Sequence, residues 1–272
     1  MIPDKNFNGN IARFSGFTDC YDKYRPEMPL LVIDILGKYL GKRPSVVVDI
    51  GSGTGLSTFV WKDHADLTIG IEPNNDMLEK AREKLKLNFT NNIQFVCGYS
   101  NQTGLESNFA DIITCSQSFH WMEPVSTLAE VSRVLADGGV FAAYDCDWPP
   151  IINWEIDNAF ACLVFKAGEI VDKYSDTEDR VRMWSKGEQL KNLMASKMFR
   201  YCREVVFHNT EKSDAERFIG IALSQGVLQT ALRKGSADID TEVKMFCDKV
   251  KSFFKDRTLD IIFSYRMRLG VK

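Results

Sequence analysis

The chain has 272 residues, 44% of them hydrophobic and 26% charged, so it can bury the core of one large domain or of a domain with a cap. A formal net charge of −3 argues against nucleic acid as the main partner, because proteins that bind its backbone usually carry a basic face. The seven cysteines are scattered without a C-x-x-C pair, which predicts no metal site and fits a reducing compartment. We see no signal peptide and no apolar run of membrane-spanning length, and we therefore expect a cytoplasmic protein without a membrane partner.

Strands and helices alternate in the first half of the chain. We expect buried strands at 45–50, 67–71, 93–97, 109–115 and 140–144, and helices at 29–40, 56–61, 74–87 and 124–135. This alternation predicts βαβ units and a parallel sheet.

The pattern changes after residue 147. We expect helices at 154–171, 186–194, 213–223, 226–233 and 240–254, and strands at 201–208 and 259–267, the last possibly antiparallel to its neighbour. The chain is therefore divided into a core at 1–147, a helical cap inserted after the fifth strand at 148–198, and the remainder of the core sheet and helices at 199–272.

A glycine loop follows the first strand, where Asp49 precedes Gly51, Gly53 and Gly55. Glycine lets the chain turn sharply against a ligand, and the N–H groups of a helix after the turn would suit a carboxylate or a phosphate. Leu56 occupies the place of the third glycine in the dinucleotide fingerprint, and no G-K-[ST] of a P-loop is present. The spacing G-x-G-x-G after Asp49 resembles motif I of class I S-adenosylmethionine-dependent methyltransferases.

An acidic residue, Glu72, ends the second strand and can accept hydrogen bonds from both hydroxyls of a ribose. Dehydrogenases use such an acid too, so Glu72 by itself does not choose the cofactor. The resemblance implies that Glu72 is the ribose ligand, with Pro73 beside it and Met77 near the adenine. After Gly98 the family commonly has an acid for the adenine amino group. This chain has none there, although Ser100, Asn101 or Gln102 could substitute.

Two further segments carry the resemblance. Residues 108–121 resemble the fourth motif of the family, and the pair His120-Trp121 is typical of a subgroup that includes trans-aconitate-type carboxylate methyltransferases. Residues 21–29 resemble the Y-x-x-x-R-P-x-x-P segment that lies over the cofactor in that subgroup.

The resemblance implies an α/β fold with a doubly wound, mostly parallel seven-stranded sheet, S-adenosylmethionine as cofactor and S-adenosylhomocysteine as product. The predicted cofactor-binding residues follow strand ends or belong to the segments just described. They are Tyr24, Arg25, Asp49, Gly51, Ser52, Gly53, Glu72, Pro73, Met77, Gly98, Tyr99, Ser100, Ser116, Gln117 and Trp121.

Methyl transfer from a sulfonium requires alignment and exclusion of water, and it requires a base only when the acceptor must lose a proton. His120 is the best candidate for a base, although we favour the alternative that it packs beside the cofactor with Trp121 and holds the loop. Asp145, after the fifth strand, could act as base or bind a cationic acceptor. Arg13, Arg180 or Arg182 could pair with an acidic acceptor.

We expect a small-molecule acceptor, with a carboxylate as one option, and a monomer or homodimer. The residues 116–119 lack the Asn/Asp-Pro-Pro-aromatic motif, which argues against amino-group methylation of RNA or protein. Two other functions stay open at this point, a non-catalytic S-adenosylmethionine-binding module and an NAD-dependent oxidoreductase.

Overall fold

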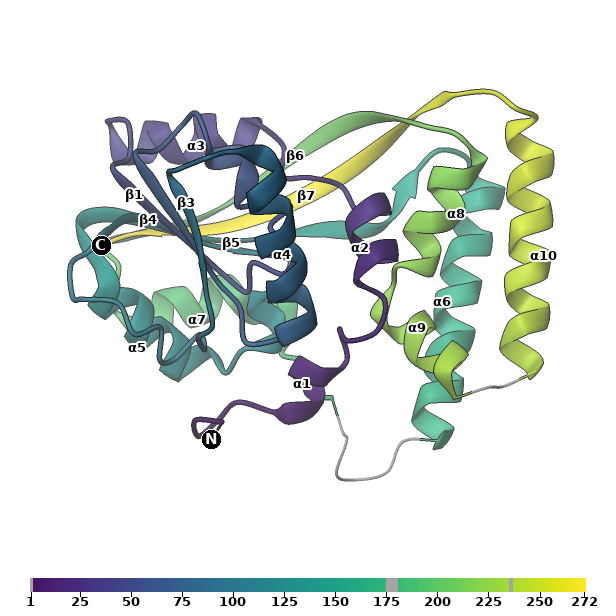
Figure 1. Ribbon diagram of the computed structural model, residues 1–272, viewed down its shortest axis with the longest axis horizontal. Helices are drawn as coiled ribbons and strands as arrows, with labels where there is room; N and C mark the ends of the chain where they lie inside the picture. Colours follow the sequence, from purple (N-terminus) through teal and green to yellow (C-terminus); the bar gives the residue numbers. More distant parts are fainter. Residues whose placement is uncertain (1, 175–180, 235–236) are drawn as a thin grey trace.

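The computed structural model describes residues 2–174, 181–234 and 237–272, so the predicted acid-binding Arg180 lies outside the described residues. A seven-stranded sheet with the order β3-β2-β1-β4-β5-β7-β6 runs through this described part (Figure 1). The strands are β1 (Val46–Ile50), β2 (Leu67–Ile71), β3 (Ile93–Val96), β4 (Ala110–Ser116), β5 (Leu135–Ile151), β6 (Tyr201–Ser213) and β7 (Leu259–Val271).

Strands β1 to β5 run parallel to one another. Strand β7 lies between β5 and β6 and is antiparallel to both. This arrangement confirms the predicted doubly wound, mostly parallel seven-stranded sheet. The crossover from β1 to β2 goes one way along the sheet and the return to β4 goes the other, so the order reverses at β1. In such sheets the ligand crevice lies beyond the carboxyl ends of the strands at the point of reversal.

Alternate residues of the central strands point to two different cores, as the period of two of a β-strand requires. Val47 and Ile112 belong to the core shared with α3 (Leu31–Leu40), while Val48 and Ile113 belong to the core shared with α5 (Pro124–Val134) and α7 (Gln189–Ser196). Helix α4 (Asn75–Asn88) covers β3 in a smaller cluster. Both faces of the sheet are covered, which explains why its strands are almost continuously apolar.

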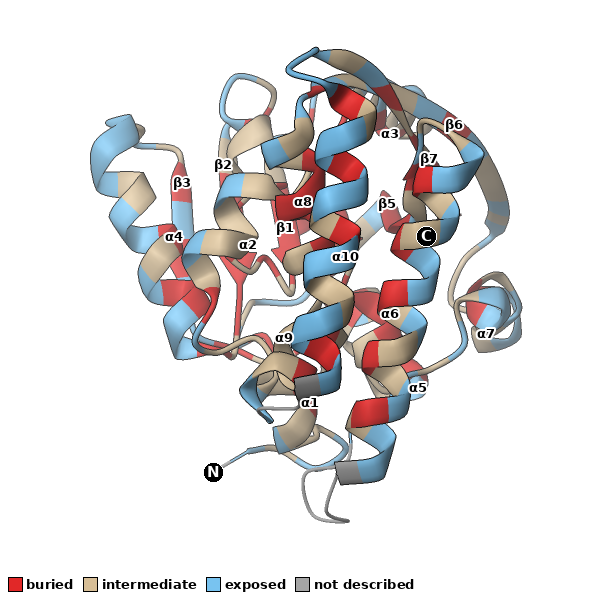
Figure 2. Ribbon diagram, turned by 90° about the vertical axis from the view of Figure 1, so that its right-hand side faces the viewer, coloured by how far each residue is buried: buried red, intermediate tan, exposed pale blue. Residues whose placement is uncertain are grey.

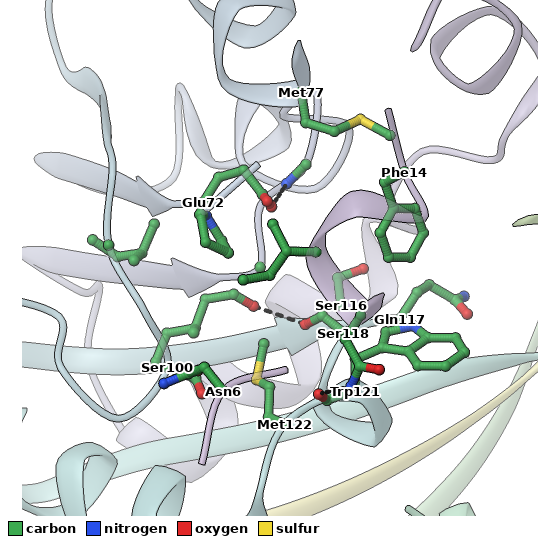
Figure 3. Close-up of a pocket in the computed structure, with 18 of the residues that line it drawn as sticks. Asn6, Phe14, Glu72, Met77, Ser100, Ser116, Gln117, Ser118, Trp121 and Met122 are labelled. Carbon is green, nitrogen blue, oxygen red and sulfur yellow. Dashed lines mark hydrogen bonds between the residues drawn. The ribbon is translucent and has the colours of Figure 1, made fainter. Parts of the chain in front are cut away.

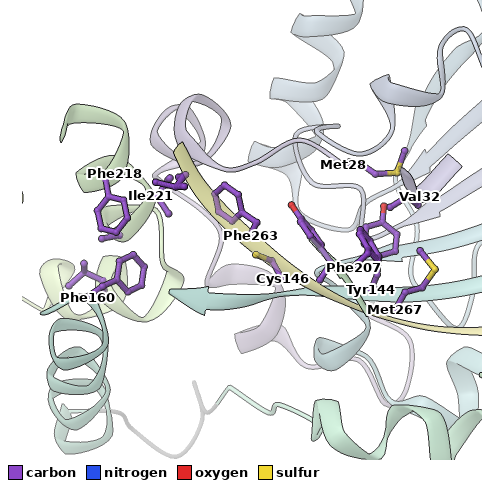
Figure 4. Close-up of a cluster of buried hydrophobic side chains, with 14 of the residues drawn as sticks. Met28, Val32, Tyr144, Cys146, Phe160, Phe207, Phe218, Ile221, Phe263 and Met267 are labelled. Atoms are coloured by element: carbon purple, nitrogen blue, oxygen red, sulfur yellow. The ribbon is translucent and has the colours of Figure 1, made fainter. Parts of the chain in front are cut away.

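Four helices form a layer beside the sheet: α6 (Trp154–Tyr174), α8 (Ala215–Leu223), α9 (Gly226–Arg233) and α10 (Ala237–Phe254), as Figures 1 and 2 show. Rings hold the layer together, since Phe160 lies 6.0 Å from Phe218 and 6.1 Å from Phe246. Figure 4 shows this cluster continuing along β7 to the middle of the sheet. The boundary predicted from the sequence between the cap (148–198) and the remainder (199–272) therefore separates helices that pack together, because α6 contacts α9 and α10.

Several elements differ from the sequence predictions. The helix expected at 56–61 is reduced to the short 3-10 turn η1 (Phe59–Trp61), and β5 continues to Ile151 into the segment predicted as cap. Helix α7, also within that segment, returns to the sheet, preceded by the turn η4 (Lys186–Glu188). The N-terminal helices α1 (Asn8–Ala12) and α2 (Thr18–Tyr24) were not predicted. No helix in the described ranges has the length and apolarity to cross a bilayer.

Candidate active site

A pocket opens at the carboxyl ends of β1 to β4, where the sheet order predicts the ligand crevice. We name it the main pocket; the empty space within it amounts to about 750 Å³, part of which is open to solvent. In Figure 3, Glu72 and Met77 lie across this pocket from Met122. Ten of the predicted cofactor-binding residues line it: Gly51, Gly53, Glu72, Pro73, Met77, Gly98, Ser100, Ser116, Gln117 and Trp121.

The glycine loop forms one wall, and each glycine has a different reason. Gly51 has φ +72°, and a Cβ there would lie 2.6 Å from the Cβ of Ser118, so this turn requires glycine. Gly53 has φ +55° and open space where a Cβ would stand, so a side chain at this position would enter the pocket. Gly55 instead faces Phe59 and Phe95 and serves packing.

The loop does not lead into an α-helix, because only η1 follows, and the expected helix N-terminus for anion binding is therefore absent at 56–61. Asp49 also differs from its predicted role, since it is fully buried beneath the loop and does not line the pocket. Its carboxylate accepts hydrogen bonds from the hydroxyls of Ser57, Thr58 and Thr114. Asp49 thus shapes the loop from below, where burial raises its pKa.

Glu72 is the buried carboxylate of the main pocket. Its Oε2 accepts a hydrogen bond from the N–H of Gly53 at 2.9 Å, and its Oε1 accepts from the N–H of Asn74 at 2.8 Å. Burial raises the pKa of Glu72 to about 7, although both hydrogen bonds favour the ionised form. Each carboxylate oxygen can accept a further hydrogen bond, so two adjacent hydroxyls can bind here.

The ends of β3 and β4 complete the floor. Ser100 lines the pocket, and its hydroxyl is hydrogen-bonded to that of Thr127 at 2.9 Å. Tyr99 lies outside the lining, because its backbone turns back to bond Gln102. Asn101 also lies outside and accepts a hydrogen bond from the amide of Asn6.

An N-terminal segment covers the pocket, and sequence reasoning missed it. Asn6, Phe7, Asn10, Ile11 and Phe14 line the pocket from residues around α1. The buried Asn10 donates hydrogen bonds to the carbonyls of Trp121 and Arg182, both at 2.7 Å, and accepts one from the N–H of Arg182. One side chain thus joins three segments far apart in the sequence.

Residues 21–25 reach the site differently from the prediction. Tyr21, not Tyr24, lines the pocket, because the ring of Tyr24 lies against Gly220 of α8 and its hydroxyl donates to Glu216. Arg25 is held by the carbonyl of Ser224 at 3.0 Å.

Arg25 lines a second cavity, which we name the Arg25 chamber; its empty space amounts to about 490 Å³, part of it open to solvent. It shares Tyr21, Gly51, Ser116 and Gln117 with the main pocket, so the two cavities adjoin. The rest of its lining consists of Pro26, Glu27, Met28, Ser52, Thr54, Leu56, Ser57, Tyr144, Trp148 and Tyr265. Ser52, predicted to bind the cofactor, belongs to this chamber.

His120 and Asp145 line neither cavity, so the structure does not support either as a base. Both are buried, and Nδ1 of His120 lies 3.0 Å from Oδ1 of Asp145, without a well-aligned hydrogen bond. Lys186 at 3.0 Å and Arg268 at 3.7 Å also approach this carboxylate. Burial opposes its ionisation, but His120 and Lys186 outweigh burial and lower the pKa of Asp145 to about 2. Burial lowers the pKa of His120, and the pair forms part of the protein interior.

The other predicted acid-binding arginines are engaged with rings. Arg13 lies 4.0 Å above Trp121, and Arg182 lies 4.9 Å above Trp184. Neither of these two arginines lines the main pocket or the second cavity, named the Arg25 chamber.

Comparison with known proteins finds similarity to methyltransferases. Residues 48–143 match the profile of the family described as a methyltransferase domain. The chain is 28% identical over 185 residues to a probable S-adenosylmethionine-dependent methyltransferase of Saccharomyces cerevisiae, covering 65% of this chain and 62% of that protein. It is 26% identical over 171 residues to an uncharacterised methyltransferase of Mycobacterium bovis, covering 62% and 63%. The chain thus spans less than two thirds of the length of these curated relatives.

Solved structures share the fold. A provisionally named type II methyltransferase of Anaeromyxobacter dehalogenans superimposes with a TM-score of 0.66 at 17% identity, covering 91% of this chain and 98% of that one. A phosphoethanolamine N-methyltransferase of Haemonchus contortus, in complex with S-adenosylhomocysteine, gives a TM-score of 0.57 at 16% identity, covering 100% and 61%. Residues 48–143 thus match a methyltransferase domain, and the chain has the fold of these solved methyltransferases.

Proposed function

We propose that this chain binds S-adenosylmethionine across the two cavities and transfers its methyl group to a small-molecule acceptor. The observation that carries the proposal is Glu72, a buried carboxylate anchored by the N–H of Gly53 and aimed into a pocket that a glycine keeps open. Such a group suits the two hydroxyls of a ribose. Ile71 and Met77 offer an apolar wall for the adenine.

The methionyl end of the cofactor then points towards the Arg25 chamber through the shared wall at Gly51 and Gln117. Arg25 is a partly buried cation; desolvation lowers its pKa, and Tyr21, Cys146 and Cys20 are its electrostatic partners. A carboxylate would offset the cost of burying this charge, which supports Arg25 as the ligand of the methionyl carboxylate. Ser52 also lines the Arg25 chamber, and its buried hydroxyl has no hydrogen-bond partner among the described residues.

When bound, the cofactor supplies a methyl group on a sulfonium; the acceptor oxygen bonds to that carbon while the carbon–sulfur pair stays on sulfur. The residues of this chain align the two molecules and keep water away. Phe14 and Trp121 line the pocket edge to face, with ring centroids 6.1 Å apart, and would exclude water there.

The acceptor in this proposal is a small carboxylic acid. His120 and Asp145 lie outside both cavities, so neither stands beside the space proposed for the acceptor. A carboxylate arrives ionised and gives a methyl ester without a base. This chemistry agrees with the resemblance to trans-aconitate-type methyltransferases.

Isothermal calorimetry tests the binding step, with micromolar dissociation constants expected for S-adenosylmethionine and S-adenosylhomocysteine. Methyl release from labelled cofactor, assayed against pooled small acids and pooled amines and alcohols, tests the reaction. Absence of binding would refute the proposal as a whole. Binding without turnover on any pool would favour a non-catalytic module, and turnover only on amines would overturn the acid acceptor.

A further inference from the structure

The Arg25 chamber concentrates unmatched polar groups. Five buried side-chain atoms of its lining have no hydrogen-bond partner among the described residues: Nε of Arg25, Oγ of Ser52, Oγ1 of Thr54 and the hydroxyls of Tyr144 and Tyr265. A buried polar atom without a partner costs free energy, so a cluster of them in one cavity indicates a ligand that supplies the partners.

The two tyrosines come from adjacent strands of the sheet. Tyr144 on β5 pairs with Met267 on β7, and Tyr265 lies two residues before Met267 on the same face of β7. Diagonal neighbours of this kind have Cα atoms about 7–8 Å apart, within reach of one small ligand for long side chains. Figure 4 shows Tyr144 close to Met28, which lines the same chamber.

These phenols can act only as hydrogen-bond donors or neutral acceptors in the physiological range. Burial raises the pKa of Tyr144 well above its ordinary value; the charge of Asp49 adds to the effect, and the nearby side chain of Ser116 opposes it without forming a well-aligned hydrogen bond. Burial likewise raises the pKa of Tyr265. The nearby guanidinium of Arg25 can only donate, so the surroundings favour an incoming atom that accepts hydrogen bonds and carries negative charge.

Trp148 supplies the apolar side of the chamber. Its ring lies 4.6 Å from the guanidinium carbon of Arg25 and 6.4 Å from the parallel ring of Phe160. Because Phe160 is buried in the helical layer, Trp148 is fixed between that layer and the chamber. The apolar part of an acid can lie against it.

We propose that Tyr144 and Tyr265 form the binding site for the methyl acceptor, donating their hydroxyl hydrogens to one carboxylate oxygen of a small acid while its other oxygen faces the methyl group. This inference rests on the proposed function for the cofactor in the neighbouring pocket. It assigns Arg25 to the cofactor and the two tyrosines to the acceptor, and it makes the tyrosines specificity-determining residues.

The test uses saturation-transfer NMR on the full chain saturated with S-adenosylhomocysteine. The probes are benzoate, butyrate and succinate, each beside its amide. We expect the acids to bind and the amides to bind at least about tenfold more weakly, because hydrogen bonds to a charged group are the stronger ones. Tyr144→Phe and Tyr265→Phe should each weaken acid binding about tenfold, and the double variant should abolish it.

The control variant is Tyr39→Phe, which removes a hydroxyl that bonds Arg203 far from both cavities. It should bind the acids as the original chain does. Calorimetry should give the same affinity for S-adenosylhomocysteine in all four variants. Acid binding that survives in the double variant, or equal binding of acids and amides, would overturn the acceptor site. Failure of S-adenosylhomocysteine to bind the original chain would instead remove the proposed function.

Discussion

Replacing Glu72 by alanine should weaken S-adenosylhomocysteine binding about 100-fold. The structure leaves one further lone pair on each oxygen of Glu72 after Gly53 and Asn74 are bonded. Two ribose hydroxyls donating to this carboxylate contribute about 1.5–3 kcal/mol each, and water that enters the vacated space recovers part of this. A net loss of about 3 kcal/mol corresponds to the 100-fold change.

The same carboxylate predicts how binding changes with pH. The pKa of Glu72 is raised to about 7 by burial, and only the ionised form accepts from both hydroxyls. With that pKa, about 90% is ionised at pH 8 and about 10% at pH 6, so the affinity should fall about tenfold between the two. The fall should disappear in Glu72→Ala.

Calorimetry at pH 6, 7 and 8 measures both effects. Glu130 offers the matched control, because Arg133 and Thr103 lower the pKa of this carboxylate to about 2 despite partial burial, and it lies outside the main pocket. Glu130→Ala should keep both the affinity and its pH dependence. Equal affinity of Glu72→Ala and the original chain, with both folded by circular dichroism, would refute the assignment of Glu72 to the ribose.

The remaining predictions concern stability and the pocket walls. Gly53→Val should abolish S-adenosylhomocysteine binding in calorimetry, since its side chain would enter the main pocket; a folded variant that binds normally would contradict the loop geometry. Asp145→Ala should lower the free energy of unfolding in urea by about 2 kcal/mol, because Lys186 loses its buried partner while Arg268 keeps Glu204 at 2.8 Å; S-adenosylhomocysteine affinity should stay the same. The pKa of Asp145 is depressed from 3.8 to about 2, so its contribution to stability is present above pH 3.8 and is lost as the pH falls through 2, a loss that acid unfolding of the variant should lack. Asn10→Ala should speed hydrogen exchange of residues 6–14 and accelerate dissociation of the product; unchanged exchange would show that its three hydrogen bonds do not hold the segment.

The sequence predicted the sheet and its ligand-binding edge because their signals are local. Runs such as Val46–Ile50 are too apolar for any position but a buried strand, and a glycine loop or an acid at a strand end has few alternative uses. Glu72 and Gly53 accordingly lie where the motifs predicted. Their roles in binding stay predictions until the measurements above are made.

The cover of the pocket could not be predicted, since it depends on contacts between distant segments. Asn10 looks like an ordinary polar residue, and only its contacts with Trp121 and Arg182 reveal its role. The segment 21–29 carries two tyrosines, and which one faces the pocket depends on Gly220, almost 200 residues later, which gives room to the ring of Tyr24. Likewise His120 is a candidate base by its sequence motif, and only the structure shows that it is buried beside Asp145 and lines neither cavity.

The position of β7 in the sheet has a consequence for folding during synthesis of the chain. Within the described residues, β6 (Tyr201–Ser213) pairs in the sheet only with β7 (Leu259–Val271), which lies between β5 and β6 although it follows both along the chain. A nascent chain that ends before residue 259 therefore leaves the β5 edge open and gives β6 no partner in the sheet. Both are unpaired strand edges that invite aggregation. Ribosome stalling or truncation before β7 should therefore yield insoluble product. Loss of β6 alone, by contrast, would leave β7 paired with β5 at the edge of the parallel strands.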